Sequence, residues 1–358
     1  MARGARARKP ARESSGFSGR LTEKWASRQD SLVASMPRRV RGSEGPEGLD
    51  ATVRVAVIDI GTNSTRLLVA DVNEGAVDEV ERRTTVTTMG RGVDHTGLLC
   101  SDAVEDVCGV IAGYRARYEE LGADRVTAIA TSAVREAVNG AAFIAELRER
   151  FGLNAQLLTE EEEAHLTYLG ATSHRPAEGP TLVLDIGGGS TELIVGSGPQ
   201  VDFHTSLQAG TIRHSERHLT SDPPDPHELE DLASDIRNLI ERAVAAQPQI
   251  TARRAIAVAG TPTSLAAIDQ ALEPYDPGRV HGYQLGMHRI QRMLSRLSSL
   301  PLAERLRVPG LHPGRAPTIV AGTVIMVQVM RAFRMQEVEV SELDILHGSA
   351  LSAAMAPA

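Results

Sequence analysis

The chain has 358 residues, a formal net charge of −8, 42% hydrophobic residues and 23% charged residues, which is ordinary for a globular protein. The negative charge argues against nucleic acid or an anionic membrane as a partner, and no apolar run approaches the ~18 residues of a transmembrane helix. Cys100 and Cys108 form no CxxC pair, so we expect a reduced, cytoplasmic protein. Lys9 and Lys24 are the only lysines, which excludes a lysine-bearing phosphate loop farther along the chain.

Residues 1–51 are rich in Arg, Ala, Ser, Gly and Pro and show little apolar periodicity, which predicts a disordered basic tail. They lack the ~7–15-residue apolar core of a secretory signal. A transit peptide is one alternative, and a later start codon at Met36 is another.

Strands and helices alternate from Val53 onward, which predicts an α/β protein. In the first half we expect strands at 53–61, 66–72, 125–130 and 155–159, a helix after the third of these, and helices at 139–152 and 160–172, with Asn139 as an N-cap. The segment 173–180 contains Pro and Gly and marks a domain boundary. In the second half we expect a strand–turn–strand unit at 181–196, a proline-started amphipathic helix within 221–246, and a strand, Gly turn and helix at 253–269. A long apolar helix at 317–335, a strand at 337–341 and a last helix at 347–356 follow.

The tripeptide Asp-Ile-Gly occurs at 59–61 and again at 185–187, each time between two apolar runs, which indicates two related domains. Gly187, Gly188 and Gly189 can adopt positive φ, and a third glycine leaves backbone amides bare for an anion. A dinucleotide fingerprint does not fit, because Glu192 stands where its last glycine would be and a strand comes next. Aspartates beside anion-binding turns favour a magnesium ion between carboxylate and phosphate.

Six segments together resemble, in order, the motifs of the Ppx/GppA phosphatases, a family of exopolyphosphatases and guanosine pentaphosphate phosphatases. They are VAVIDIGTNSTRLLVADV, ATSAVREAVN, LLTEEEEAHLTYLGA, LVLDIGGGSTELIVG, QAGTIRHSE and AVAGTPTSLAAID. The resemblance implies two actin-like (ribonuclease H-like) α/β domains, 52–170 and 171–358, that flank an interdomain cleft. It also implies cytoplasmic hydrolysis of a terminal phosphoanhydride, with Mg²⁺ or Mn²⁺ as cofactor, K⁺ as a further cation, and a homodimer.

The resemblance assigns roles to individual residues. Glu163 takes the position of the base that activates water, a choice that the run Glu160 to Glu163 alone leaves open. Metal binding falls to Asp185, Glu192 and Asp59. Substrate phosphates fall to the Gly-rich turns and to arginines, whose guanidinium groups pair with phosphate oxygens. These residues are Asn63, Ser64, Arg66, Arg135, Gly187, Gly188, Gly189, Ser190, Thr191, Arg213, Gly260 and Thr261.

The chain also departs from the family pattern. Thr62 replaces a common serine, Glu160 and Glu161 replace smaller residues, and SELDILHG replaces an arginine-bearing turn. The helical C-terminal domains of longer members are not present after Ala358, so we expect a preference for short polyphosphates. Inorganic polyphosphate is the expected substrate and pppGpp the alternative. A kinase of the same superfamily and a non-catalytic (p)ppGpp or polyphosphate sensor are the other hypotheses.

Overall fold

The computed structural model describes residues 52–173, 175, 179–245 and 250–356. The chain divides into the units Met1–Gly48 and Leu49–Ala358, and both sheets belong to the second unit. The predicted basic tail, residues 1–51, lies outside the described residues. Within the described ranges, no helix combines the length and apolarity of a membrane span.

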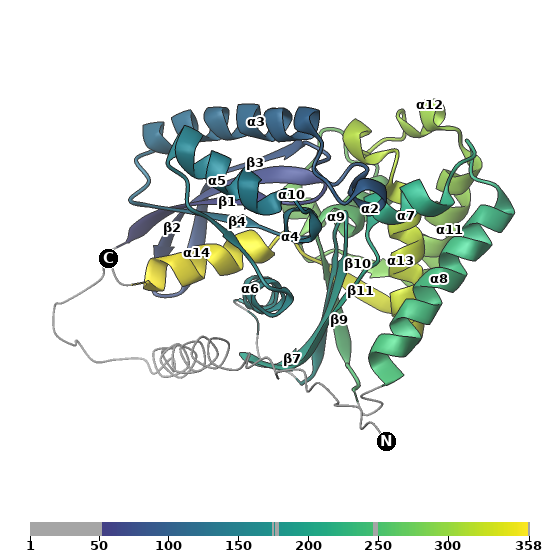
Figure 1. Cartoon of the computed structure of the whole chain (residues 1–358). Coiled ribbons are helices and arrows are strands. Elements are labelled where there is room, and N and C mark those ends of the chain that lie inside the picture. The colour runs from purple at the N-terminus through teal and green to yellow at the C-terminus, as the bar shows by residue number, and fades with distance from the viewer. Residues whose placement is uncertain (1–51, 174, 176–178, 246–249, 357–358) are drawn as a thin grey trace, which may run out of the picture. The chain divides into compact units, whose positions relative to one another are not determined.

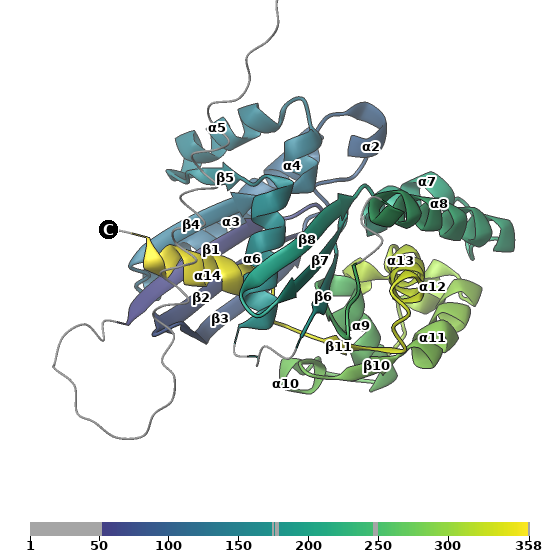
Figure 2. The ribbon, with the colours of Figure 1, turned by 90° about the horizontal axis from the view of Figure 1, so that it is seen from below.

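The first sheet has five strands in the order β3-β2-β1-β4-β5 (Figures 1 and 2). Its β3–β2 and β2–β1 pairs are antiparallel, and its β1–β4 and β4–β5 pairs are parallel. The strands are β1 (Val53–Ile60), β2 (Ser64–Asn73), β3 (Ala76–Val86), β4 (Arg125–Ala130) and β5 (Ala155–Leu157).

The second sheet repeats this plan with one added strand, in the order β10-β11-β9-β6-β7-β8. From β8 to β11, two antiparallel pairs are again followed by two parallel pairs. The duplicated order confirms the predicted fold of two actin-like α/β halves. The strands are β6 (Thr181–Ile186), β7 (Thr191–Ser197), β8 (Gln200–Leu207), β9 (Arg254–Val258), β10 (Gln284–Gly286) and β11 (Glu337–Val340).

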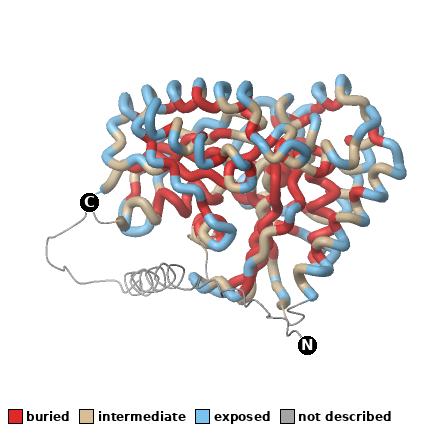
Figure 3. The backbone as a smooth tube through the Cα atoms, in the orientation of Figure 1, coloured by how far each residue is buried: buried red, intermediate tan, exposed pale blue. Residues whose placement is uncertain are grey.

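Helices cover both sheets, as parallel pairing requires, and the buried backbone in Figure 3 runs through the strands. Helices α3 and α5 pack on one face of the first sheet, and α8, α11 and α13 pack on one face of the second. The helices and one 3₁₀ turn are α2 (Val93–Thr96), α3 (Ser101–Glu120), α4 (Ser132–Glu136), α5 (Gly140–Phe151), α6 (Glu160–Thr172), α7 (Thr211–His218), α8 (Pro226–Ala245), α9 (Gly260–Asp269), α10 (Pro277–Val280), α11 (Met287–Ser299), α12 (Leu302–Arg305), η1 (Pro313–Arg315), α13 (Ile319–Ala332) and α14 (Ile345–Met355).

Helices α6 and α14 pack against each other, and each covers the remaining face of one sheet (Figure 2). The side chains of Leu346 and Ala350 in α14 pack on the first sheet, whereas Ala164 and Tyr168 in α6 pack on the second. Glycine permits the crossing, because a Cβ added at Gly170 would lie 1.9 Å from the carbonyl oxygen before α14. The last helix of the chain, α14, therefore packs on the first sheet. The predicted domain boundary between residues 170 and 171 stays a prediction.

The predicted elements are present at the expected places, with one correction at a helix start. Asn139 occupies the N-cap position of α5, but its side chain makes no capping hydrogen bond. Its Oδ1 accepts from the Leu99 amide at 2.9 Å and its Nδ2 donates to the Leu99 carbonyl at 2.9 Å. The Asn139 side chain therefore links the start of α5 to the segment before α3 and does not cap α5.

Candidate functional site

The two glycine turns have the same backbone construction. The Gly61 amide donates to the Ser64 carbonyl at 3.0 Å, and the Gly187 amide donates to the Ser190 carbonyl at 3.0 Å. The turns also touch, since a Cβ added at Gly188 would lie 3.0 Å from Thr62 Cγ2. The repeated tripeptides therefore bring the ends of both sheets together.

The three consecutive glycines are explained by close packing and not by the positive φ angles that we expected. None of the three glycines has φ in the left-handed region. Close approach explains them instead, because a Cβ at Gly189 would lie 2.5 Å from Ser132 Oγ. A Cβ on either Gly188 or Gly189 would thus push the two turns apart.

One pocket opens at this junction and gathers most of the predicted residues. The predicted residues that line it are Asp59, Asn63, Ser64, Arg66, Glu163, Asp185, Gly187, Gly188, Gly189, Ser190, Glu192, Gly260 and Thr261. Asn63 Oδ1 is buried and has no hydrogen-bond partner, which leaves it to accept from a ligand or a water. Arg135, Thr191 and Arg213 do not line the pocket.

Glu163 is the buried member of the four-glutamate run, with 7% of its surface exposed, and it lines the pocket. A capping box between Thr159 and Glu162 starts α6, and it directs Glu162 back to the helix start. Arg135 Nη1 donates to Glu163 Oε2 at 2.8 Å. Burial nevertheless raises the pKa of Glu163 to about 7, since Arg135 offsets only part of the desolvation.

Asp185 and Glu192 form a like-charged pair across the second hairpin. They are register partners in the antiparallel β6–β7 ladder, and both line the pocket. Burial raises the pKa of Asp185 to about 7, and burial followed by repulsion from Glu163 and Asp185 raises the pKa of Glu192. Two facing carboxylates with raised pKa values are a site that a cation would stabilise.

Asp59 and Arg66 are the corresponding partners in the first hairpin, and they form an ion pair. Arg66 Nε and Nη2 donate to Asp59 Oδ2 at 2.8 and 2.6 Å, and Arg66 Nη1 donates to Asp344. Burial still raises the pKa of Asp59, and its buried Oδ1 has no hydrogen-bond partner. Arg66 thus lines the pocket but is held by two carboxylates.

The predicted metal ligands do not form a closed cage. Among the described residues, three or more His, Cys, Asp or Glu ligand atoms come within 4.8 Å of one another in two places, and neither includes Asp59, Asp185 or Glu192. Mg²⁺ needs only one or two carboxylates beside water and phosphate oxygens, so an open pair is sufficient. Asp185 and Glu192 fit this requirement better than Asp59, whose charge is paired with Arg66.

The side chains of Arg213 and Thr191 are engaged by other protein groups. Arg213 Nε donates to the Gly189 carbonyl at 2.7 Å, and its guanidinium pairs with Asp94 and Glu136. The Thr191 hydroxyl donates to the Ala209 carbonyl. These contacts favour a structural role for both residues over direct contact with phosphate.

Arg315 lines the pocket and was not anticipated from the sequence. A Cβ added at Gly260, the first residue of α9, would lie 1.7 Å from Arg315 Nη1. That nitrogen is buried without a hydrogen-bond partner, and no described carboxylate forms an ion pair with Arg315. Burial lowers the pKa of Arg315, as expected for a cation without a counter-charge. Nothing in the local sequence marks this arginine, because only the fold brings it to α9.

Comparisons with known proteins match most of the chain to one family. Residues 68–356 match the Ppx/GppA phosphatase family. Exopolyphosphatase 2 of Mycobacterium tuberculosis is 35% identical over 318 residues, which cover 85% of this chain and 99% of that protein. Exopolyphosphatase 1 of the same species is 29% identical over 304 residues, which cover 83% and 87% of the two chains.

A solved structure extends the comparison. The crystal structure of the Aquifex aeolicus member of the Ppx/GppA family superposes with a TM-score of 0.73 at 30% identity. The match covers 85% of this chain and 98% of that one. The resemblance inferred from six short motifs is confirmed, and with it the enzyme class: this chain belongs to the Ppx/GppA phosphatase family.

Proposed function

We propose that the chain is an exopolyphosphatase that hydrolyses the terminal phosphoanhydride of inorganic polyphosphate. One observation carries the proposal: a single pocket combines two glycine turns, the buried Glu163 and the unpaired Arg315. The names of the Mycobacterium tuberculosis relatives support the choice of polyphosphate. The free cysteines Cys100 and Cys108 fit the cytoplasmic setting that we propose.

Phosphate oxygens would be bound from three sides. The amides of Gly188 and Gly189 offer donors at one turn, and Asn63 and Ser64 line the pocket at the other. The N-terminus of α9, at Gly260, adds a partial positive charge beside the Arg315 guanidinium. Fixed donors of this kind stabilise the charge that develops on a transferring phosphoryl group.

Glu163 is the proposed general base. It would take a proton from a water as the water oxygen bonds to the terminal phosphorus and the bridging P–O bond breaks. Orthophosphate and a chain shorter by one unit are the products. A carboxylate with a pKa of about 7 is well matched to this task near neutral pH. Arg135 is a positioning residue that holds Glu163 Oε2.

Asp185 and Glu192 are the residues that we propose to hold Mg²⁺, with Mn²⁺ as a substitute. The bound ion would offset the negative charge of the phosphate chain beside the carboxylates. The raised pKa values of both carboxyl groups support this assignment, because a nearby cation would relieve the repulsion between them. Dependence on K⁺ and homodimerisation are further proposals.

The decisive experiment measures orthophosphate release from polyphosphates of defined length, with Mg²⁺ and with EDTA. We expect Mg²⁺-dependent turnover that Glu163→Gln lowers by about 10²–10⁴-fold, the usual contribution of a general base. The exposed Glu161→Gln on the same helix is the matched control and should retain activity. Tight binding of polyphosphate without turnover would favour the sensor hypothesis, and transfer to an acceptor in preference to water would favour a kinase.

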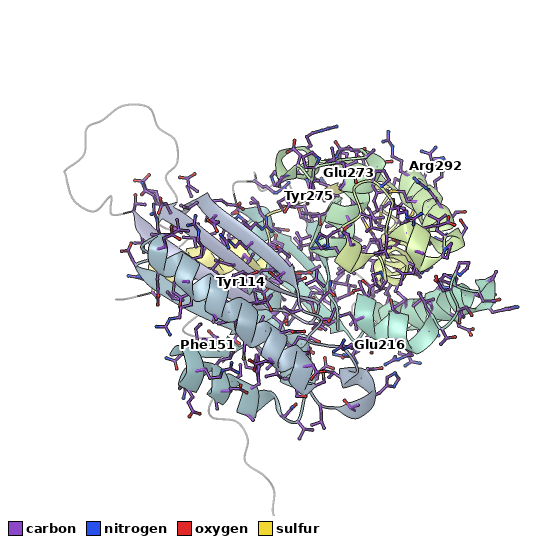
Figure 4. All side chains as sticks on the ribbon, turned by 90° about the horizontal axis from the view of Figure 1, so that it is seen from above. Tyr114, Phe151, Glu216, Glu273, Tyr275 and Arg292 are labelled. Carbon is purple, nitrogen blue, oxygen red and sulfur yellow. The ribbon has the colours of Figure 1, made fainter. Side chains whose placement is uncertain are left out.

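Hydrolysis of pppGpp is a second candidate, favoured by a neighbouring cavity of about 710 Å³. This cavity shares Arg66, Gly260 and Arg315 with the phosphate pocket. Tyr275, 45% exposed, lines it and lies beside Glu273 in Figure 4, where its ring could stack on a base. If pppGpp is the substrate, Tyr275→Ala should lower kcat/KM for pppGpp and leave kcat/KM for polyphosphate unchanged.

A further inference from the structure

A second cluster of ligand-type side chains lies outside the phosphate pocket. His214 and His218 are four residues apart on α7, and Asp235 projects from α8. One ligand atom from each of the three lies within 4.8 Å of the others. The spacing of four residues places both imidazoles on one face of the helix.

His214 is buried in a state that hydrogen bonding does not satisfy. Its side chain has no exposed surface, and neither ring nitrogen has a hydrogen-bond partner. A neutral imidazole carries a lone pair on one ring nitrogen, so His214 offers a ligand atom that no described group uses. Buried polar atoms are rarely left unsatisfied, and a missing water or ion is a common reason.

The distances suit a tetrahedral metal site. His218 Nε2 lies 3.0 Å from Asp235 Oδ2, and His214 Nε2 lies 3.5 Å from the same oxygen. Zn²⁺ with bonds of about 2.0–2.1 Å holds its ligand atoms about 3.3 Å apart, which is the edge of the coordination tetrahedron. The 3.5 Å separation is longer than a well-formed hydrogen bond, so hydrogen bonding alone accounts for His218 and not for His214.

Two charged side chains, Glu216 and Arg217, lie between the histidines on α7. Arg217 Nη1 lies 3.7 Å from Asp235 Oδ2 and opposes a cation there. The Arg217 guanidinium, however, is held by Asp94, with Nη2 2.9 and 3.0 Å from its two oxygens. Glu216, labelled in Figure 4, accepts from the Gly92 amide. Glu216 is thus engaged away from the imidazoles, whereas Arg217 stays near the Asp235 carboxylate but makes its shorter contacts with Asp94.

We propose that His214, His218 and Asp235 bind a divalent transition-metal ion, with Zn²⁺ the best match to two imidazoles and one carboxylate. A water would complete the tetrahedron. The ion would link α7 to α8, because its histidine ligands belong to α7 and its aspartate ligand belongs to α8. The first amides of α7 donate to the carbonyls of Gly187 and Gly188 at 2.9 Å, so the site also steadies the phosphate-binding turn.

The test uses the untagged full-length protein, stripped of metal, and titrates it with Co²⁺ and then Zn²⁺. We expect one equivalent of Co²⁺ with the intense visible absorption of a tetrahedral site, displaced by Zn²⁺, and a Zn²⁺-dependent rise in Tm. His218→Gln and Asp235→Asn should lose this absorption and lower the Zn²⁺ affinity at least tenfold. Both residues are partly exposed, so these variants should fold, which circular dichroism verifies.

His227→Gln is the matched control, an exposed histidine at the start of α8. It should leave the absorption and the Tm rise unchanged. The proposal is overturned if the wild-type protein shows no tetrahedral Co²⁺ spectrum, or if His218→Gln and Asp235→Asn bind Co²⁺ and Zn²⁺ as the wild type does. Either result would leave the cluster as a histidine–aspartate hydrogen bond without metal.

Discussion

Glu163→Gln should lower turnover by about 10²–10⁴-fold and at the same time stabilise the fold. The pKa of Glu163 rises from an ordinary 4.5 to about 7 in the folded protein. The difference of 2.5 units, at 1.36 kcal/mol per unit, means that ionised Glu163 destabilises the folded state by about 3 kcal/mol. Because this shift already includes the attraction of Arg135, a neutral glutamine of similar shape should recover up to that amount.

The size of the stabilisation depends on pH. For a group whose folded pKa is raised, stability is fully present below pH 4.5 and is lost as pH rises through about 7. Urea unfolding in EDTA should therefore show Glu163→Gln gaining about 3 kcal/mol over the wild type at pH 8 and little at pH 4.5. The exposed Glu161→Gln should change stability by less than about 1 kcal/mol at either pH. A variant no more stable than the wild type at pH 8 would refute the burial argument.

Three further substitutions test the surroundings of the pocket. Arg135→Met removes the positive charge that lowers the pKa of Glu163. The acidic limb of the pH profile of kcat/KM should therefore shift to higher pH by about one unit or more. An unshifted limb would argue against Glu163 as the base. Arg315→Met should raise KM for polyphosphate about tenfold or more, as expected for a charge-assisted hydrogen bond to phosphate, and an unchanged KM would remove Arg315 from the site. Gly170→Ala places a Cβ 1.9 Å from the N-cap carbonyl of α14 and should lower the free energy of unfolding by about 1–3 kcal/mol in urea. Gly109→Ala, in an exposed turn of α3 with nothing within 4 Å, is the control and should stabilise by about 0.5–1 kcal/mol; equal effects at both glycines would contradict the packing argument.

Most of the fold could be predicted because the repeated hairpins have strong apolar patterns. The strand β3 was not predicted, since its sequence AVDEVERRTTV is rich in charge and has no buried residue at the edge of the sheet. Helix α3 was also not predicted, although its buried residues recur at the spacing of a helix. The packing of the last helix on the first sheet is a tertiary property that no local pattern reports.

The candidate site could be predicted only in part. The glycine turns and their aspartates are visible as a repeat, and Glu163 could be chosen among four glutamates only through the family resemblance. Burial now distinguishes Glu163, because its three neighbours in the run are more exposed. Arg315 and Asp344 come from segments far along the chain, and no periodicity or spacing connects them with the turns.

The two hairpins show how one scaffold supports two electrostatic roles. In each hairpin the aspartate faces the residue seven positions later, Arg66 opposite Asp59 and Glu192 opposite Asp185. Opposite charges across a ladder stabilise the hairpin and like charges destabilise it. The first turn is thus neutralised by its own partner strand, whereas the second has two buried carboxyl groups that a proton or a bound cation can neutralise. A single difference at equivalent positions therefore separates the turn held by an ion pair from the turn that we propose to hold a metal ion beside phosphate, although the Asp-Ile-Gly tripeptides are identical.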